Sequence, residues 1–212
     1  VAKKKVWWAF VPPVKGPLDS IDAYLQAKLA SKGLAFSPRA SERELTRRLF
    51  FGLTGLPPAD EDYKRSYAEN VDRLLASPAY GERWARYWLD VVRFGETDGG
   101  EHNFERFHAW RYRDWVIDAF NRDMPYTQFV REQITGDLLR PKDPQSVAAT
   151  GFLVLGPWAW FSYDRVQMRF DIADQQVDLI GRTVMGLTLG CARCHDHKFD
   201  PVTNKDYYAM AG

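Results

Sequence analysis

The chain has 212 residues, of which 45% are hydrophobic and 15% aromatic, so it is long enough to bury a substantial core. Its 29 Lys and Arg residues balance 28 Asp and Glu residues, and the formal charge of +1 gives no reason to expect nucleic acid or an anionic membrane as a partner. The longest apolar run, residues 151–161, is shorter than the roughly 20 residues of a spanning helix. No membrane span is predicted.

Helical spacing of apolar residues recurs along the chain, whereas strict alternation never lasts beyond a few residues. The predicted fold class is therefore mainly α, an irregular helical domain with long loops. We expect an extended N-terminal arm over residues 1–17 and a single helical domain over residues 18–212. The chain starts without an initiator Met, and we interpret it as a processed protein or a fragment of a longer one.

Start and stop signals divide the chain into successive helices. Ser41 and Glu44 have the spacing of a capping box, and Trp84, Trp88 and Val91 are expected on one helix face. In chain order, helices are predicted over residues 21–29, from 41 to about 52, 60–77, 80–94, 110–120, 127–134 and 166–187, with another at the C-terminal end.

The strongest helical pattern lies after a loop at residues 141–144 and leads directly to the two cysteines. Its apolar residues are separated by steps of four and three, as expected for one buried face. They are Val166, Phe170, Ala173, Val177, Ile180, Val184 and Leu187.

Cys191 and Cys194 are the two cysteines of the chain, and His195 follows the second directly. In a helical turn, positions i, i+3 and i+4 lie on one face, so these three side chains can address one planar ligand. Covalent haem requires this arrangement, because two thiols add to its vinyl groups and the adjacent imidazole reaches the iron. Gly190 permits a close approach of the backbone. The segment therefore predicts one covalently attached haem c near the C-terminus.

Other interpretations of this segment have less support. A zinc site normally takes two ligand pairs, and a thioredoxin-like pair is expected near a βαβ pattern; the sequence predicts neither. His197 cannot reach the opposite face of the ring that His195 binds, so we interpret it as a hydrogen-bonding or propionate-side residue. Arg193 is a candidate partner for a haem propionate, with a solvated surface position as the alternative.

Several short blocks of the sequence match those of one protein family, in the same order. The longest of them, residues 186–201, reads GLTLGCARCHDHKFDP, and the others are residues 53–58, 74–85, 110–115 and 206–208. Together they resemble the planctomycete cytochrome-like family PSCyt2, also known as DUF1549, over roughly residues 8–212.

This resemblance implies an exported multidomain protein, with another cytochrome-like module before this region and a separate domain after it. It implies attached haem at Cys191, Cys194 and His195 only, and it leaves an association with carbohydrate open. Because haem is attached to Cys-x-x-Cys-His after export, we expect a periplasmic, cell-surface or extracellular location.

The second axial ligand of the iron decides between electron transfer and ligand chemistry. His102 is the first candidate, because glycines in its polar loop permit an approach to the ring, although an exposed loop histidine is equally compatible. His108, in an aromatic setting, is the alternative distal ligand. The sulfur candidates, which are more typical of core packing, are Met124, Met168, Met185 and Met210.

The sequence thus favours a c-type cytochrome module that transfers single electrons to redox partner proteins or neighbouring haem domains. Two alternatives stay open. One is a haem enzyme or sensor with an open sixth coordination site, and the other is a non-haem structural module whose cysteines hold zinc or stay as thiols.

Overall fold

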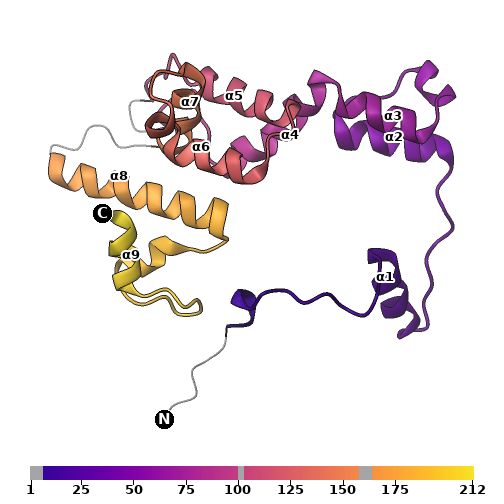
Figure 1. Ribbon diagram of the computed structural model, residues 1–212, viewed down its shortest axis with the longest axis horizontal. Coiled ribbons are helices and arrows are strands. Elements are labelled where there is room, and N and C mark those ends of the chain that lie inside the picture. Colours follow the sequence, from indigo (N-terminus) through magenta and orange to yellow (C-terminus); the bar gives the residue numbers. More distant parts are fainter. Residues whose placement is uncertain (1–6, 100–102, 158–163) are drawn as a thin grey trace, which may run out of the picture. The chain divides into compact units, whose positions relative to one another are not determined.

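The computed structural model describes residues 7–99, 103–157 and 164–212. Within these ranges the fold is mainly α, as predicted, and a single bridge between Thr97 and Glu105 is the only β-type pairing. No helix in these ranges has both the length and the apolar character needed to cross a bilayer. The helices labelled in Figure 1 are α1 (Ile21–Ala30), α2 (Glu42–Leu53), α3 (Tyr67–Leu75), α4 (Pro78–Val91), α5 (Trp110–Asn121), α6 (Tyr126–Leu139), α7 (Pro144–Ala149), α8 (Arg165–Ile180) and α9 (Asn204–Ala211).

The chain divides into two compact units, residues 1–45 and 46–212, and the division falls inside α2. In the first unit, the Ser20 hydroxyl accepts a hydrogen bond from the Ala23 amide at 3.1 Å and so caps α1, which buries none of its residues. The second unit contains both hydrophobic cores described below. The division predicted at residue 17 stays a prediction.

Local capping explains where the early helices begin. Ser41 and Glu44 form the predicted capping box: the Ser41 amide donates to Glu44 Oε2 at 2.8 Å, and the Glu44 amide donates to Ser41 Oγ at 3.3 Å. The helical region predicted over residues 60–77 consists of two separate helices. A short 3-10 helix ends at Lys64, and Ser66 then begins α3 through a second capping box with Glu69.

Two further boundaries differ from the prediction. Helix α6 has a kink at Thr135, whose φ of −136° and ψ of 18° are not helical, directly after the predicted end at residue 134, and the helix then continues to Leu139. The prolines at 141–144 suggested a loop, but Pro144 is the first residue of α7, a position where its missing N–H costs nothing. The Asp143 carboxylate accepts from the Gln145 amide at 3.0 Å and caps that helix.

The first core is formed by helices α4 to α7, and its packing corrects the predicted face of α4. Trp84 and Val91 are exposed, whereas Ala85 is fully buried. Gly81 explains why α4 turns this face, and not the predicted one, toward α5, because a Cβ at this position would lie 2.5 Å from the Ile117 carbonyl oxygen of α5. Small residues thus mark the face along which α4 and α5 pack. The buried members of this core are Ala85, Val92, Tyr112, Trp115, Val116, Ala119, Phe129, Ala149, Phe152 and Leu179.

The long helix predicted to reach residue 187 ends earlier. Helix α8 ends at Ile180, continues as one π-helical turn over Gly181–Met185, and stops at Gly186, whose φ of +66° is left-handed. The Leu187 amide donates back to the Gly181 carbonyl oxygen at 2.9 Å. The chain therefore reverses direction here, and the segment that follows packs with α9 against α8 (Figure 1).

Candidate functional site

The Cys-x-x-Cys-His segment lies on a 3-10 turn, Leu189–Arg193, with Cys194 directly after it. Residues three apart eclipse one another in a 3-10 helix, so Cys191 and Cys194 share one side of the turn. Both are free thiols and both are exposed, as is His195. The three side chains that sequence analysis singled out are therefore accessible together.

The opposite side of the turn is anchored in a second, smaller core. Ala192, between the two cysteines, is fully buried, and Leu189 is 3% exposed. The buried members of this core are Val177, Leu189, Ala192 and Tyr207. The turn lies close to α8 because Gly181 has no side chain: a Cβ there would stand 2.6 Å from Leu189 Cγ.

Asn204, the first residue of α9, braces the turn from the C-terminal side. Its side-chain amide donates to the carbonyl oxygens of Ala192 and Arg193, both at 2.8 Å. Its backbone amide donates to Asp196 Oδ1, also at 2.8 Å. These bonds fix the backbone before Cys194 and the Asp196 side chain after it, and they leave the thiol uninvolved.

His195 is exposed and has a defined tautomer. Its Nδ1 lies 2.8 Å from the Asp196 carbonyl oxygen. Because a carbonyl only accepts, Nδ1 carries the proton, and the neutral ring then presents an unprotonated Nε2. A backbone carbonyl on Nδ1 is the usual way in which proteins orient a histidine that binds metal through Nε2.

His197 has the opposite surroundings, and its side chain is only 8% exposed. Nδ1 accepts from the amides of Phe199 at 3.2 Å and Asp200 at 2.8 Å, so Nε2 carries the proton and donates to Thr188 Oγ1 at 2.9 Å. Every nitrogen of this ring is used inside the loop. The interpretation of His197 as a hydrogen-bonding residue fits these contacts.

Arg193 lies between two carboxylates of α8, at 3.3 Å from Asp171 Oδ1 and 3.0 Å from Asp174 Oδ2. Asp174 also accepts a hydrogen bond of 2.5 Å from the Tyr207 hydroxyl. Burial, followed by this hydrogen bond, raises the pKa of Tyr207 above its ordinary range. The network ties the turn to α8 and α9. A contact between Arg193 and a haem propionate stays a prediction.

The candidate distal ligands lie in different parts of the chain. His102 lies outside the described residues. His108 is exposed at the turn before α5, and no contact in the described ranges joins it to the cysteines. Met185 and Met210 are half-exposed, and Met124 packs against the first core. The identity of the sixth ligand stays a prediction.

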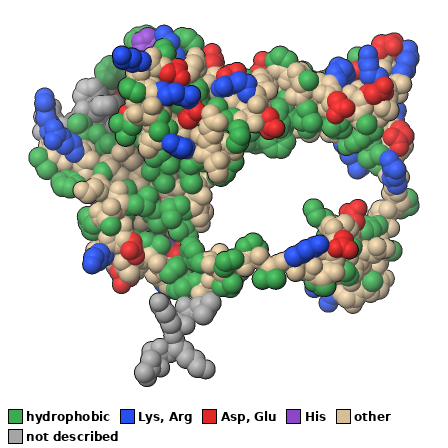
Figure 2. All heavy atoms as spheres, in the orientation of Figure 1, with side chains coloured by type: hydrophobic (Ala, Val, Ile, Leu, Met, Phe, Trp, Pro, Cys, Tyr) green, Lys and Arg blue, Asp and Glu red, His purple; other side chains and the backbone are tan. Residues whose placement is uncertain are grey.

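Large hydrophobic side chains are exposed on the C-terminal segment that contains the turn. In the view of Figure 2, hydrophobic groups gather over α8 and α9. The exposed ones in this segment are Val166, Phe170, Met185, Phe199, Tyr208 and Met210. Tyr208 is close to the turn, since its hydroxyl donates to the Arg193 carbonyl oxygen at 3.3 Å. Such a concentration of apolar surface is typical of a site that another apolar group covers.

A metal held by side chains alone has little geometric support. Among the described residues, no three His, Cys, Asp or Glu side chains converge on a position that would hold an ion. A zinc ion needs four such ligands at about 2.0–2.3 Å. Covalent haem needs no such convergence, because only the imidazole binds the iron and the sulfurs bind at the ring edge.

Comparison with known families places the chain in one of them. A family model described as PSCyt2, protein of unknown function (DUF1549), matches residues 20–212. The chain belongs to the PSCyt2 family. No curated protein and no solved structure matches this PSCyt2 chain. The matched range includes the turn, both cores of the second unit and all of α1 to α9.

Proposed function

We propose that this PSCyt2 chain is a c-type cytochrome module, with one haem attached through Cys191 and Cys194 and ligated by His195. The observation that carries the proposal is the state of these three groups within one anchored turn. Two thiols are free and exposed, and the imidazole presents an unprotonated Nε2 because Nδ1 is held by a carbonyl.

The donor set fits the group chemically. Attachment forms one C–S bond per thiol at a vinyl group, and the thiol hydrogen goes to the other vinyl carbon, so both sulfurs must be reduced beforehand. Ala192 and Leu189 hold the back of the turn in the core, which keeps both thiols on the outer side. The apolar side chains around the turn favour an apolar macrocycle over water.

When bound, haem iron supplies a one-electron redox couple. The protein's contribution is to fix the axial imidazole: the Asp196 carbonyl holds the His195 ring, and the Asn204 amide holds the Asp196 carboxylate. Because the turn lies at the surface, a partner can approach the site closely. We therefore propose single-electron transfer to redox partner proteins or neighbouring haem domains, with no substrate chemistry of its own.

Location follows from the same chemistry. Attachment of haem to Cys-x-x-Cys-His takes place after export, so we propose a periplasmic, cell-surface or extracellular position for the mature protein. The free thiols at Cys191 and Cys194 are the substrates of that attachment.

Intact-mass spectrometry tests the proposal. The chain is expressed with an exported leader in cells that carry haem-attachment machinery, beside an established c-type cytochrome as a positive control. We expect a mass increase of one haem for this chain and none for the Cys191→Ala/Cys194→Ala double variant. A bare polypeptide mass, while the control cytochrome is fully loaded, overturns the proposal.

Carbon monoxide separates electron transfer from ligand chemistry. An iron with two protein ligands keeps its reduced spectrum when carbon monoxide is added, whereas an open position binds the gas and shifts the Soret band. We expect no shift. A stoichiometric shift would instead assign the open-site alternative, a haem enzyme or sensor.

A further inference from the structure

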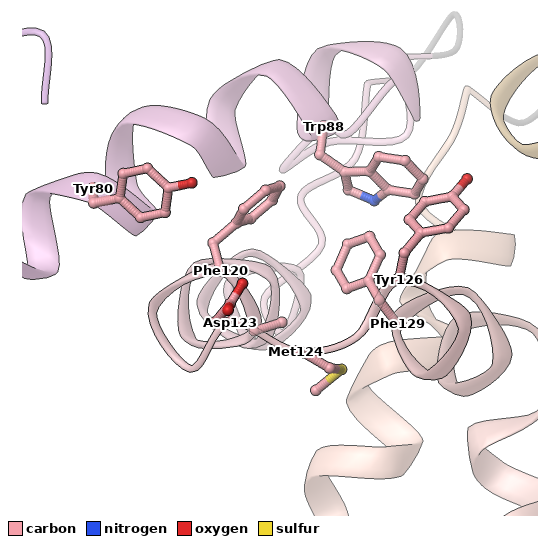
Figure 3. Close-up of a pocket in the computed structure, with 8 residues that line it drawn as sticks. Tyr80, Trp88, Phe120, Asp123, Met124, Tyr126 and Phe129 are labelled. Atoms are coloured by element: carbon pink, nitrogen blue, oxygen red, sulfur yellow. The ribbon is translucent and has the colours of Figure 1, made fainter. Parts of the chain in front are cut away.

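A pocket of about 250 Å³ lies in the first core, away from the Cys191–His195 segment in sequence. Helices α4, α5 and α6 and the turn between α5 and α6 form its walls. The volume is below that of pockets for drug-sized molecules, which begin at roughly 300 Å³, so its occupant is small. Figure 3 shows that its walls consist mainly of aromatic rings.

The rings stand at steep angles to one another rather than in a stack. Trp88 and Phe129 meet at 68° with their centroids 4.9 Å apart, and Phe120 meets Phe129 at 60° and 5.8 Å. Tyr80 and Tyr126 add two further rings (Figure 3). Several ring faces and edges therefore surround one small volume, as in an aromatic cage.

Trp88 is held firmly in this arrangement. Its indole N–H donates to Gln133 Oε1 at 2.8 Å, and Gln133 Oε1 also accepts from the Tyr112 hydroxyl at 2.6 Å. The polar end of the indole is thus satisfied on the core side. The remaining ring surface is available to the pocket without breaking a hydrogen bond.

Of the described residues that line the pocket, Asp123 is the one with a carboxylate, and none is Lys or Arg. Among the described residues Asp123 has no side-chain hydrogen bond or ion pair, and the neighbouring Arg122 is engaged with Asp118 at 2.8 Å. The backbone of Asp123 has a φ of +48°, a left-handed conformation that is uncommon outside glycine. This conformation ends α5, where the Met124 amide donates to the Ala119 carbonyl oxygen at 3.0 Å, and it places Asp123 at the pocket wall.

We propose that this pocket binds a small quaternary ammonium group, such as the trimethylammonium end of a choline-like molecule. The ring faces attract a cation through their quadrupoles, the methyl groups contact the apolar walls, and Asp123 supplies the counter-charge. An anion is disfavoured by the Asp123 carboxylate and by ring faces that are themselves negative. The proposal is independent of haem attachment, because it uses no residue of the Cys191–His195 segment.

Methionine methyl NMR on the full 212-residue chain tests the proposal. The chain has four methionines, of which Met124 lines the pocket while Met168, Met185 and Met210 lie in the C-terminal segment and serve as internal controls. Tetramethylammonium and choline should shift the Met124 methyl resonance saturably and leave the other three unchanged. The uncharged isostere 3,3-dimethylbutan-1-ol should bind at least about fivefold more weakly, since it lacks the cation.

Two matched pairs of variants complete the experiment. Asp123→Asn keeps a residue that tolerates the left-handed backbone and removes only the charge, so choline affinity should fall about threefold or more, whereas Asp90→Asn should leave it unchanged. Tyr126→Leu should weaken binding, and Tyr126→Phe should not. Tyr126 is 58% exposed, so neither variant endangers the fold. Equal affinity for choline and its uncharged isostere, or no shift of Met124 with either cation, overturns the proposal.

Discussion

His195 and His197 are two residues apart, and their hydrogen bonds give them opposite roles. His195 is exposed and uses one nitrogen, while His197 is nearly buried and uses both, tying Thr188 to the backbone of Phe199 and Asp200. An exposed group with one unused nitrogen can bind a ligand. A buried group with none can only support the loop.

Replacement of each histidine by alanine should separate these roles in the haem-free chain. His197→Ala leaves one hydroxyl and two amides without partners, so we expect the free energy of unfolding to fall by about 2–3 kcal/mol. His195→Ala removes an exposed side chain and should change it by less than about 0.5 kcal/mol. Urea unfolding measures both. Equal losses would contradict the assignment.

The role of His195 as an iron ligand stays a prediction that rests on the spacing of two thiols and an imidazole. The exclusion of His197 as an axial ligand, which rests on its position along the chain, also stays a prediction. The bond of His197 to Thr188 depends on a loop conformation that residue spacing alone does not specify.

Buried tyrosines should make the fold sensitive to alkali. Burial raises the pKa of Tyr112, and burial with the hydrogen bond to Asp174 raises that of Tyr207. A raised pKa in the folded state contributes stability that is present below the unfolded pKa of about 10 and is lost as the pH rises above it. We expect unfolding free energy to fall from about pH 10 upward.

The Tyr207→Phe variant checks this origin. It removes one of the two tyrosines whose pKa is raised by burial, so the stability of the variant should fall less steeply above about pH 10 than that of the unchanged chain. Tyr208→Phe, which alters an exposed ring, should keep the original slope. Denaturant unfolding at a series of pH values measures the three slopes, and identical slopes for all three chains would sink the explanation.

At the scale of elements, the site depends on a helix that stops early. Apolar spacing of four and three suggested a helix to residue 187, but Val166 and Phe170 at its start are exposed. The actual end is set by Gly181 and Gly186, one permitting contact with Leu189 and the other a left-handed backbone. The apolar spacing of the sequence predicts neither the contact at Gly181 nor the left-handed backbone at Gly186, because glycine adds no apolar side chain to the pattern.

Gly181→Ala should therefore disturb the turn. The new Cβ would stand 2.6 Å from Leu189 Cγ and 2.9 Å from the Leu187 carbonyl oxygen, so we expect a loss of about 1–3 kcal/mol in unfolding free energy. We also expect poorer haem loading, since the cysteines follow this contact. Gly52→Ala, which meets open space inside α2, is the matched control and should be neutral or stabilising. If Gly181→Ala changed neither the unfolding free energy nor the haem loading, the result would contradict this packing.

Helices with clear capping signals were predictable, and those that depend on close packing were not. Ser41 and Glu44 correctly predicted the start of α2. The buried face of α4 was missed because Gly81 and Ala85, rather than the larger tryptophans, lie where α5 comes closest. Tertiary contact decides such faces, and a single helix's composition does not.

At the scale of the second unit, two cores of different size are joined through α8. Leu179 belongs to the larger core and Val177 to the smaller, while the Arg93 guanidinium donates to Gln175 Oε1 at 2.7 Å. The mainly α class followed from sequence patterns. The existence of a separate small core beneath the cysteines did not, because its buried members come from three segments, α8, the Leu189–Arg193 turn and α9.

Hydrogen exchange should reveal the difference between the cores. In the haem-free chain we expect amides of α9 and the Leu189–Arg193 turn to exchange faster than those of α5. The described core beneath the turn has four buried residues, whereas the described core that contains α5 has ten. Haem attachment should slow exchange in the turn and α9 selectively, because a group bound only to the folded segment stabilises it. Uniform protection across the unit in both forms would contradict this view.

The central claim is that one haem joins Cys191 and Cys194, and a peptide map tests it most directly. Arg193 lies between the cysteines, so trypsin separates residues 183–193 from residues 194–198. We predict that after digestion of the matured protein both peptides remain in one species that also contains a single haem. Two separate peptides, each with a free thiol and no haem, would contradict the account.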